Sequence, residues 1–208
     1  MITIINYGVG NLFSLVSSFD YIGEKAKVSS DADEILRADK LILPGVGAFS
    51  DAIGKLRDSG LDKILLEKAK GGTPVMGICL GMQLLFDVSY EYGEHRGLGL
   101  LHGSIVPITD TIPPEKLPRD LKIQHIGWNA LHFPGEKAPI FKYTREGDHV
   151  YFVHSYCAVD CVDSLAATTE YVSEITAAVS RDNVCACQFH PEKSGEVGLK
   201  ILKAFAEI

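Results

Sequence analysis

Short apolar segments alternate with helical ones through the first half of the chain, and this alternation limits the possible folds. Residues 1–6 form an apolar, β-branched run, and Gly8 and Gly10 interrupt it before apolar residues recur at helical spacing from Leu12 to Phe19. Further strands are predicted at 40–43 and 75–78, with helices at 48–57, 61–70 and 80–86. This order predicts an α/β fold with an open, mainly parallel, doubly wound sheet and helices on both faces. A ligand site is then expected at the carboxyl ends of the strands.

The second half of the chain has a different pattern, with shorter β-like runs that indicate a mixed or antiparallel extension of the sheet. These runs lie at 103–108, 123–133, 149–156, 164–171, 175–181 and 184–189. Three prolines make 110–120 a predicted loop, and Val197, Ile201 and Phe205 predict a packed helix over 195–208. We find no repeat and no linker, so we expect a single domain over 1–208.

The charge and hydropathy of the chain argue against several classes of protein. Its formal charge is −7 and it has no basic run, whereas a nucleic-acid surface needs clustered Lys and Arg. No apolar stretch approaches the ~20 residues that span a bilayer, and residues 1–6 are too short a run for a signal peptide. We therefore expect a cytoplasmic protein.

The five cysteines suit reduced thiols better than a disulfide framework, because their number is odd and no secretion signal precedes them. Cys185 and Cys187 form a C-x-C pair, which lacks the loop geometry of the C-x-x-C motif in zinc sites. We expect neither a metal nor a cofactor.

Cys79 lies in the segment GICLGMQ, directly after a predicted buried strand and before a helix, with Gly77 and Gly81 as its second neighbours. The same layout in G-x-S-x-G hydrolases lifts a nucleophile out of a strained turn, and the glycines avoid collisions there. A helix start favours the thiolate, and the N–H of Leu80 can point at a developing oxyanion. The alternative is a buried small residue beside a tight turn, which is the more common environment of a single cysteine.

The segment QFHPEKS favours the catalytic interpretation of Cys79, because it places His190 and Glu192 two residues apart at the end of a strand. Side chains at this spacing point the same way in an extended segment, so the carboxylate can orient the imidazole while the other ring nitrogen faces a thiol. Nucleophile, general acid/base and orienting group are then all present.

These two segments resemble the paired signatures of class I, triad-type glutamine amidotransferases. Four further blocks resemble more narrowly the family of glutaminase subunits of imidazole glycerol phosphate synthase, and together they span nearly the whole chain. They are INYGVGNLFSL at the N-terminus, LPGVGAF from Leu43, IGWN from Ile126 and YFVHSY from Tyr151.

The resemblance implies an enzyme of histidine biosynthesis made of two proteins. This chain would hydrolyse glutamine and pass ammonia to a separate cyclase with a (β/α)₈ barrel, which makes imidazole glycerol phosphate and an aminoimidazole carboxamide ribotide. Cys79 would form the glutamyl thioester, His190 would protonate the departing ammonia and then activate water, and Glu192 would orient His190.

The resemblance also implies substrate contacts at Gln83, Glu91, Ser155 and Tyr156, and a second oxyanion N–H at the Gly45–Val46 turn beside that of Leu80. Two of these positions also have an explanation that involves no substrate or oxyanion contact. Glu91 lies in the polar run YEYGEHR, where a solvated side chain is common, and Gly45 would also suit an ordinary turn that needs φ > 0. Similarly, Tyr7 and Asn11 are explained by helix initiation or by a loop near the partner.

Three other hypotheses fit parts of the pattern. A paralogous glutaminase subunit could feed a different acceptor, such as a sugar-amidating enzyme, because a hydrolytic site does not reveal where ammonia goes. A non-catalytic assembly subunit would not need Cys79, His190 and Glu192, whereas a cysteine peptidase on a similar sheet would use the same nucleophile and base.

Overall fold

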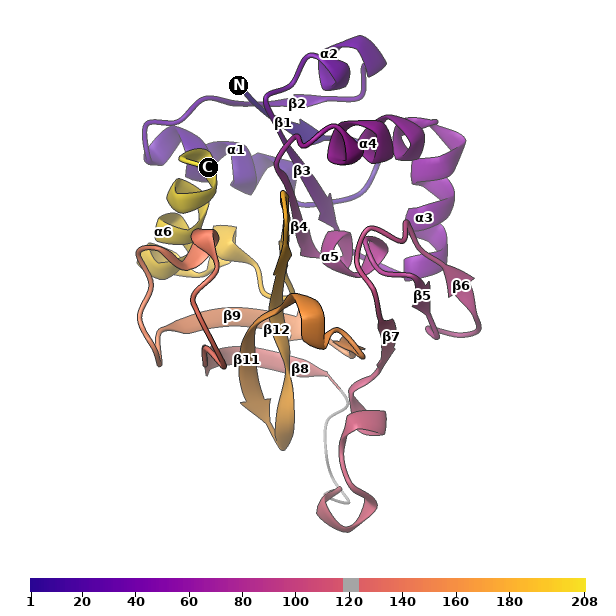
Figure 1. The fold of residues 1–208 in the computed structure, drawn as a ribbon, viewed down its shortest axis with the longest axis vertical. Helices are drawn as coiled ribbons and strands as arrows, with labels where there is room; N and C mark the ends of the chain where they lie inside the picture. The colour runs from indigo at the N-terminus through magenta and orange to yellow at the C-terminus, as the bar shows by residue number, and fades with distance from the viewer. Residues whose placement is uncertain (118–123) are drawn as a thin grey trace.

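The computed structural model describes residues 1–117 and 124–208, and seven strands in this part of the chain form the central sheet (Figure 1). Their order across the sheet is β11-β12-β13-β4-β3-β1-β2. The strands are β1 (Ile2–Ile5), β2 (Ala26–Ser29), β3 (Lys40–Gly45), β4 (Val75–Cys79), β11 (Leu165–Tyr171), β12 (Ser173–Arg181) and β13 (Val184–Cys187). The first four and β13 pair in parallel, and β11 and β12 add an antiparallel edge. The mainly parallel α/β sheet predicted from the sequence is confirmed.

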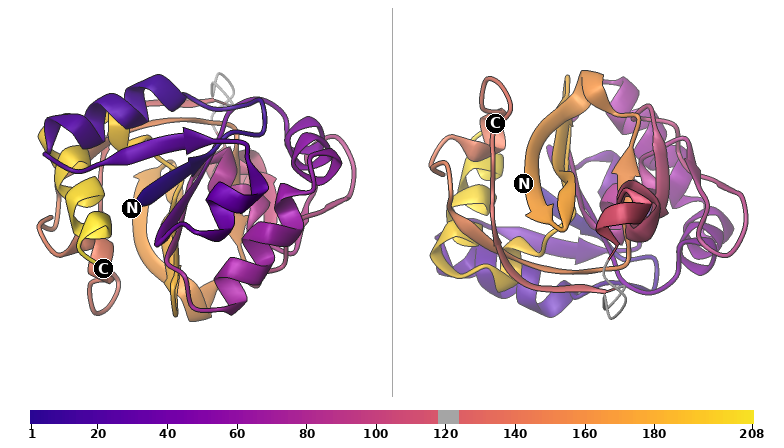
Figure 2. Two further views of the ribbon diagram at one scale, coloured as in Figure 1. Left: turned by 90° about the horizontal axis from the view of Figure 1, so that it is seen from above. Right: turned by 90° about the horizontal axis from the view of Figure 1, so that it is seen from below.

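Helices cover both faces of this sheet, as predicted. They are α1 (Leu12–Tyr21), α2 (Ala32–Leu36), α3 (Phe49–Asp58), α4 (Leu61–Lys70), α5 (Leu80–Leu84) and α6 (Gly195–Ala206). Figure 1 shows α1 and α6 on one side of the sheet and α3 and α4 on the other, and the end-on views of Figure 2 agree. Two cores follow from this arrangement, one on each face.

The central strands are buried on both faces because successive side chains point to opposite sides of a strand. In β3, Leu41 and Leu43 belong to the core beneath α3 and α4, whereas Ile42 belongs to the core beneath α1 and α6. The helices supply their apolar stripes, for example Leu15 and Phe19 from α1. This two-sided burial explains why the strands are continuous apolar runs in the sequence.

The second half of the chain adds a four-stranded sheet and a two-stranded ribbon, so the predicted mixed extension is also confirmed. The four-stranded sheet has the order β10-β7-β5-β6, and the ribbon pairs β8 with β9 in antiparallel fashion. Their bounds are β5 (Val88–Ser89), β6 (His95–Arg96), β7 (Ser104–Pro107), β8 (His125–Ala130), β9 (His149–His154) and β10 (Tyr156–Val159). Short 3₁₀ turns lie at Ile108–Thr111, Pro114–Lys116, Pro139–Phe141, Val162–Ser164 and Pro191–Lys193.

Several boundaries differ from the predictions for physical reasons. The strand predicted at 40–43 continues through Pro44 and Gly45, where β1 no longer pairs with it and a residue without an N–H is tolerated. The run at 149–156 divides at Ser155 into two strands that belong to different sheets. Neither β2 nor α2 was predicted, because β2 is a partly exposed edge strand and α2 is only five residues long.

Part of the predicted loop at 110–120 and the start of the predicted strand at 123–133 lie outside the described residues. In the described part of the chain, none of the helices combines the length and the apolarity that a bilayer crossing needs.

Candidate active site

Cys79 is the last residue of β4 and precedes α5, and its backbone has the strained conformation of a nucleophile elbow, with φ 54° and ψ −114°. A non-glycine residue held there costs of order 1–3 kcal/mol, so the surrounding structure must impose it. The neighbouring glycines make this packing possible. A Cβ on Gly81 would lie 1.9 Å from the carbonyl oxygen of Leu43, and a Cβ on Gly77 would lie 2.9 Å from the backbone of Met82. The predicted role of these glycines is confirmed.

Gly45 is needed for the close approach of β3 to α5 and not for its own backbone angle. A Cβ at this position would lie 2.7 Å from the N atom of Gly81 and 3.0 Å from the hydroxyl of Tyr7. The alternative explanation from the sequence, a turn that needs φ > 0 at Gly45, is therefore wrong, because the positive φ of +96° belongs to Gly47. Val46 lies between these glycines and is 42% exposed.

Tyr7 stabilises the same turn through its buried side chain. Its hydroxyl donates a 2.7 Å hydrogen bond to the carbonyl oxygen of Pro44, and its side chain is buried. Helix initiation does not explain Tyr7, because its side chain packs in the core, and the expectation that this loop lies near the partner stays a prediction. Burial and the nearby charge of Cys79 raise the pKa of Tyr7 far above its usual value, so its hydroxyl keeps the proton that it donates.

His190 comes to the same edge of the sheet because β13 pairs in parallel with β4, with Cys187 opposite Ile78. The backbone of His190 is held at both ends, since its N–H donates to the carbonyl of Tyr151 at 3.0 Å and its carbonyl accepts from the hydroxyl of Ser194 at 2.6 Å. Ser194 was not singled out from the sequence. The turn that follows brings Oε1 of Glu192 to 2.8 Å from Nδ1 of His190.

The electrostatic environment of His190 favours the imidazolium. Burial by itself lowers the pKa of His190, but hydrogen bonds to Cys79 and Glu192 and the charges of both groups outweigh it and raise the pKa to about 9. Since Glu192 occupies one ring nitrogen, the other is left to face the sulfur. The imidazole of His190 thus lies between the side chains of Cys79 and Glu192.

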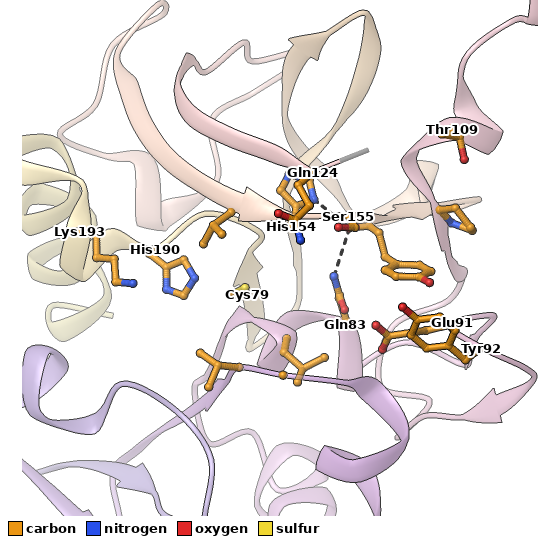
Figure 3. Close-up of a pocket in the computed structure, with 16 residues that line it drawn as sticks. Cys79, Gln83, Glu91, Tyr92, Thr109, Gln124, His154, Ser155, His190 and Lys193 are labelled. Carbon is orange, nitrogen blue, oxygen red and sulfur yellow. Dashed lines mark hydrogen bonds between the residues drawn. The ribbon is translucent and has the colours of Figure 1, made fainter. Parts of the chain in front are cut away.

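Cys79 and His190 line a cavity of about 780 Å³ at the carboxyl edge of the sheet (Figure 3). The cavity walls also contain seven other positions of interest, some predicted from the sequence and some not: Val46, Leu80, Gln83, Glu91, His154, Ser155 and Tyr156. Most of the residues singled out from the sequence thus line this one cavity. Gly45 does not line it but packs against the residues that do.

Gln83 lies one helical turn beyond Cys79 and spans part of the cavity. Its Nε2 donates to the carbonyl oxygen of Tyr156 at 3.2 Å (Figure 3). The same Nε2 also donates to Oε1 of Gln188 at 3.0 Å. Gln188 in turn places its Nε2 3.8 Å from Sγ of Cys79. Gln188 was part of the motif QFHPEKS but was given no role from the sequence, because its direction depends on how β13 packs against α5.

Glu91 is half-buried, and its carboxylate accepts a hydrogen bond from the backbone N–H of Phe49 at the start of α3. The alternative of a merely solvated side chain is wrong. A carboxylate there caps the helix and interacts favourably with its dipole. The contact also ties the cavity wall to the helix that follows the Gly45–Gly47 turn.

The segment from His154 to Tyr156 forms the opposite wall. The carbonyl of Ser155 accepts from the N–H of Ile108 at 2.9 Å, and burial, with Glu91 and Tyr92 nearby, raises the pKa of Tyr156. His154 was not singled out from the sequence beyond its place in the H-S-Y block. Its Nδ1 donates to the carbonyl of Tyr156 at 2.9 Å, and burial lowers its pKa to about 3, so the ring is neutral.

The remaining cysteines, Cys157, Cys161, Cys185 and Cys187, are buried and unpaired, and burial raises the pKa of each. The expectation of buried thiols at Cys157 and Cys187 is confirmed. For Cys187, burial raises the pKa first and the charge of Glu192 second. In the described ranges we find no group of three His, Cys, Asp or Glu side chains that could hold a metal.

Comparison with known proteins identifies the relatives of this chain. The sequence model of the family described as Glutamine amidotransferase class-I matches residues 3–207. The imidazole glycerol phosphate synthase subunit HisH of Lactococcus lactis subsp. lactis is 47% identical, over 99% of this chain and 98% of the relative. The subunit of the same name from Caldanaerobacter subterraneus subsp. tengcongensis is 48% identical, over 100% of this chain and 98% of the relative.

Solved structures agree at the level of the fold. A crystal structure of a glutamine amidotransferase superposes with a TM-score of 0.73 at 17% identity, over 100% of both chains. The structure of PurLQS from Thermotoga maritima superposes with a TM-score of 0.72 at 18% identity, over 99% of this chain and 97% of that chain.

Proposed function

Because the chain belongs to the class I glutamine amidotransferases, we propose that it is the glutaminase subunit of an imidazole glycerol phosphate synthase and acts in histidine biosynthesis. The full-length similarity to subunits of that name supports the pathway. The observation that carries the chemistry is the strained Cys79 beside the hydrogen-bonded His190–Glu192 pair, at one end of a cavity.

In the proposed reaction, the thiolate of Cys79 attacks the side-chain carboxamide carbon of glutamine and forms a tetrahedral oxyanion. His190 donates its proton to the departing nitrogen, so ammonia leaves and a glutamyl thioester remains. The imidazole then takes a proton from water, the hydroxide attacks the thioester, and glutamate and the thiolate are released. Glutamine and water are thereby converted to glutamate and ammonia, and the enzyme regains its starting state.

Glu192 keeps the imidazole of His190 in the tautomer and orientation that this sequence of proton transfers needs. Its hydrogen bond to Nδ1 leaves Nε2 for the sulfur and the substrate. The raised pKa of His190, about 9, supports an imidazolium that can act as the acid in the first step at neutral pH.

The backbone N–H of Leu80, at the start of α5, is our candidate for the first oxyanion donor, and that of Val46 is our candidate for the second. Gly47, with φ +96°, gives the peptide next to Val46 conformational freedom that other residues lack. We therefore suggest that this turn adjusts when the partner binds, so that hydrolysis is restrained in the isolated chain.

For substrate binding, we assign Gln83, Glu91, Ser155, Tyr156 and the Gly45 turn to the glutamine molecule. Both amide hydrogens of Gln83 are engaged, so its contact with glutamine would be made by Oε1, which accepts from no described residue. Glu91 offers a carboxylate to the α-ammonium group, and Ser155 and Tyr156 offer backbone and side-chain contacts at the facing wall.

The names of the relatives describe a subunit, so a partner protein is implied. The partner that we propose is a cyclase with a (β/α)₈ barrel, which receives the ammonia and makes imidazole glycerol phosphate and an aminoimidazole carboxamide ribotide. The described sheet and helices contain no such barrel, and the word subunit in the relatives' names supports a cyclase on a separate chain.

The test is a glutaminase and synthase assay of Cys79→Ala, with and without the cyclase and its nucleotide ligand. We expect the variant to lose glutamine-dependent synthesis while synthesis from added ammonium salt persists. Cys161→Ala is the matched control, because it removes a buried thiol that does not line the cavity. Glutamine-dependent synthesis that survives in Cys79→Ala would overturn the proposal.

A further inference from the structure

A directed line of hydrogen bonds ends on the sulfur of Cys79 and begins at the carbonyl oxygen of Tyr156. Gln83 donates to that carbonyl at 3.2 Å and to Oε1 of Gln188 at 3.0 Å, and Nε2 of Gln188 lies 3.8 Å from Sγ of Cys79. The line connects the wall of the cavity to the nucleophile through two amide side chains.

The donor and the acceptor in each of these hydrogen bonds follow from one group, the carbonyl of Tyr156, that can only accept. A carbonyl oxygen can only accept, so Gln83 must present its NH₂ group to Tyr156. The same NH₂ group faces Gln188, which must therefore present its oxygen to Gln83 and its own NH₂ group to the sulfur. If the amide of Gln188 were reversed, two NH₂ groups would meet at 3.0 Å.

The carbonyl oxygen of Tyr156 also accepts a hydrogen bond from a second donor. Nδ1 of His154 donates to the Tyr156 carbonyl at 2.9 Å, and Nε2 of His154 lies 2.9 Å from Nδ1 of His125. The ring of His125 stacks between those of Phe152 and Tyr171, at centroid distances of 4.6 and 4.3 Å. The carbonyl therefore has little freedom to move away from Gln83.

From this geometry we infer that Gln188 is a positioning residue for the nucleophile, since its amide N–H donates to the sulfur of Cys79 and favours the thiolate over the thiol. A hydrogen bond to the charged form of a group stabilises that form. Gln188 is 0% exposed, so it acts on the sulfur and not on the substrate. This inference deepens the proposed function, because it takes Cys79 as the nucleophile.

A purely structural role predicts a different outcome. A core amide that only satisfies Gln83 would stabilise the fold, and its loss would lower the melting temperature without changing the reactivity of Cys79. A donor to the thiolate would change the reactivity of Cys79 in a protein that is still folded. Sulfur reactivity in the isolated chain therefore separates the two roles.

The experiment measures the rate of alkylation of Cys79 by iodoacetamide at pH 7 in the full chain, with the modified cysteine identified by mass spectrometry. Gln188→Met removes the donor without adding charge, and Gln188→Glu replaces it with a carboxylate. We expect both to slow alkylation of Cys79 by about tenfold, equal to about 1.4 kcal/mol. In the assembled enzyme, kcat should fall by a similar factor while KM for glutamine stays within about twofold.

Asn183→Asp is the matched control. Asn183 precedes the opposite end of β13, and its amide donates to the carbonyls of Ala69 and Thr73 at 2.8 and 2.7 Å, far from the sulfur in the fold. This variant should lower the melting temperature and leave the alkylation rate of Cys79 unchanged. Wild-type alkylation in a folded Gln188→Met protein would overturn the inference.

A second measurement does not need any variant of Gln188 to fold. In the chain labelled with ¹⁵N at glutamine side chains, which are Gln83, Gln124 and Gln188, the amide resonances of Gln188 should shift on Cys79→Ala. Those of Gln124 should not shift, and an unchanged Gln188 signal would contradict the inference. Both measurements report on the sulfur whether or not the chain hydrolyses glutamine, so this inference and the proposed function can fail separately.

Discussion

Nδ1 of His190 lies 2.8 Å from Oε1 of Glu192, and the two side chains are only 3% and 1% exposed. Surface ion pairs contribute little to stability. This pair is buried instead, so neither group has water as an alternative partner. The contact fixes the orientation of the imidazole and raises its pKa.

Glu192→Gln should lower kcat by about 10²-fold or more with little change in KM, because the amide removes the charge that supports the imidazolium without changing the shape. The pKa of His190, about 9 in the native chain, should fall, and NMR titration of the histidine would measure it. Glu196→Gln, on the first turn of α6, is the control and should leave both values unchanged. An unaltered titration of His190 would contradict the prediction.

The pKa of His190 also predicts how stability depends on pH. Its folded pKa, about 9, lies above its unfolded value of about 6.5, so the folded state holds a proton that the unfolded state has released between these two values. This contribution is fully present below pH ~6.5 and is lost as the pH rises through about 9. Urea unfolding over this window should show a decline that is smaller in Glu192→Gln, and an identical decline would refute the assignment.

His154 should make stability depend on pH on the acidic side. Burial lowers its folded pKa to about 3, below the unfolded value of about 6.5. Its contribution is present above pH ~6.5 and is lost as the pH falls toward 3, and His125 acts in the same direction. His154→Asn should therefore lower stability at pH 7 and reduce its loss between pH 6.5 and 4. His149→Asn, at an exposed position of β9, should follow the wild type, and parallel curves for His154→Asn would contradict this account.

Gly81→Ala should prevent normal folding or destabilise the chain by about 3 kcal/mol or more, since the new Cβ would lie 1.9 Å from the Leu43 carbonyl and neither backbone can move freely. Gly54→Ala tests the same change where no atom lies within 4 Å, inside α3. There the substitution should stabilise the protein by about 0.5–1 kcal/mol. Urea unfolding of both variants measures the difference, and equal effects would show that the collision at Gly81 is relieved.

Glu91→Gln should destabilise the chain by about 1 kcal/mol, because the carboxylate caps α3 through the N–H of Phe49. It should also raise KM for glutamine, if the same carboxylate holds the α-ammonium group of the substrate. Glu94→Gln, an exposed position in the same polar run, should change neither quantity. Thermal unfolding and steady-state kinetics measure the two effects, and a wild-type KM would remove Glu91 from the proposed binding site.

Much of the fold could be predicted because the signals were local. Residues 1–6, 40–43 and 75–78 are mostly apolar, as expected of strands buried on both faces, and helical periodicity follows each of them. The edge elements β2 and α2 could not be predicted, because one is half-exposed and the other is too short for periodicity to emerge.

The candidate site was predictable where a motif carries its own geometry. Gly77-Ile78-Cys79-Leu80-Gly81 encodes a turn with its collisions removed, and His190 and Glu192 are close enough in sequence to meet. The importance of Gln188 and His154 could not be predicted in this way, because their partners are distant in the sequence. Gln188 and Gln83 are 105 residues apart, and His154 and His125 are 29 residues apart.

The sequence by itself determined the strand–helix alternation, the strained position of Cys79 and the pairing of His190 with Glu192, because each depends on residues within a few positions of one another. Only the tertiary structure decided that Gly45 is required by the backbone of Gly81, that Tyr7 supports the turn from within the core, and that Gln188 points at the sulfur. These contacts arise where β3, β4 and β13 converge with α5, and no local pattern encodes a distance between segments that only packing brings together.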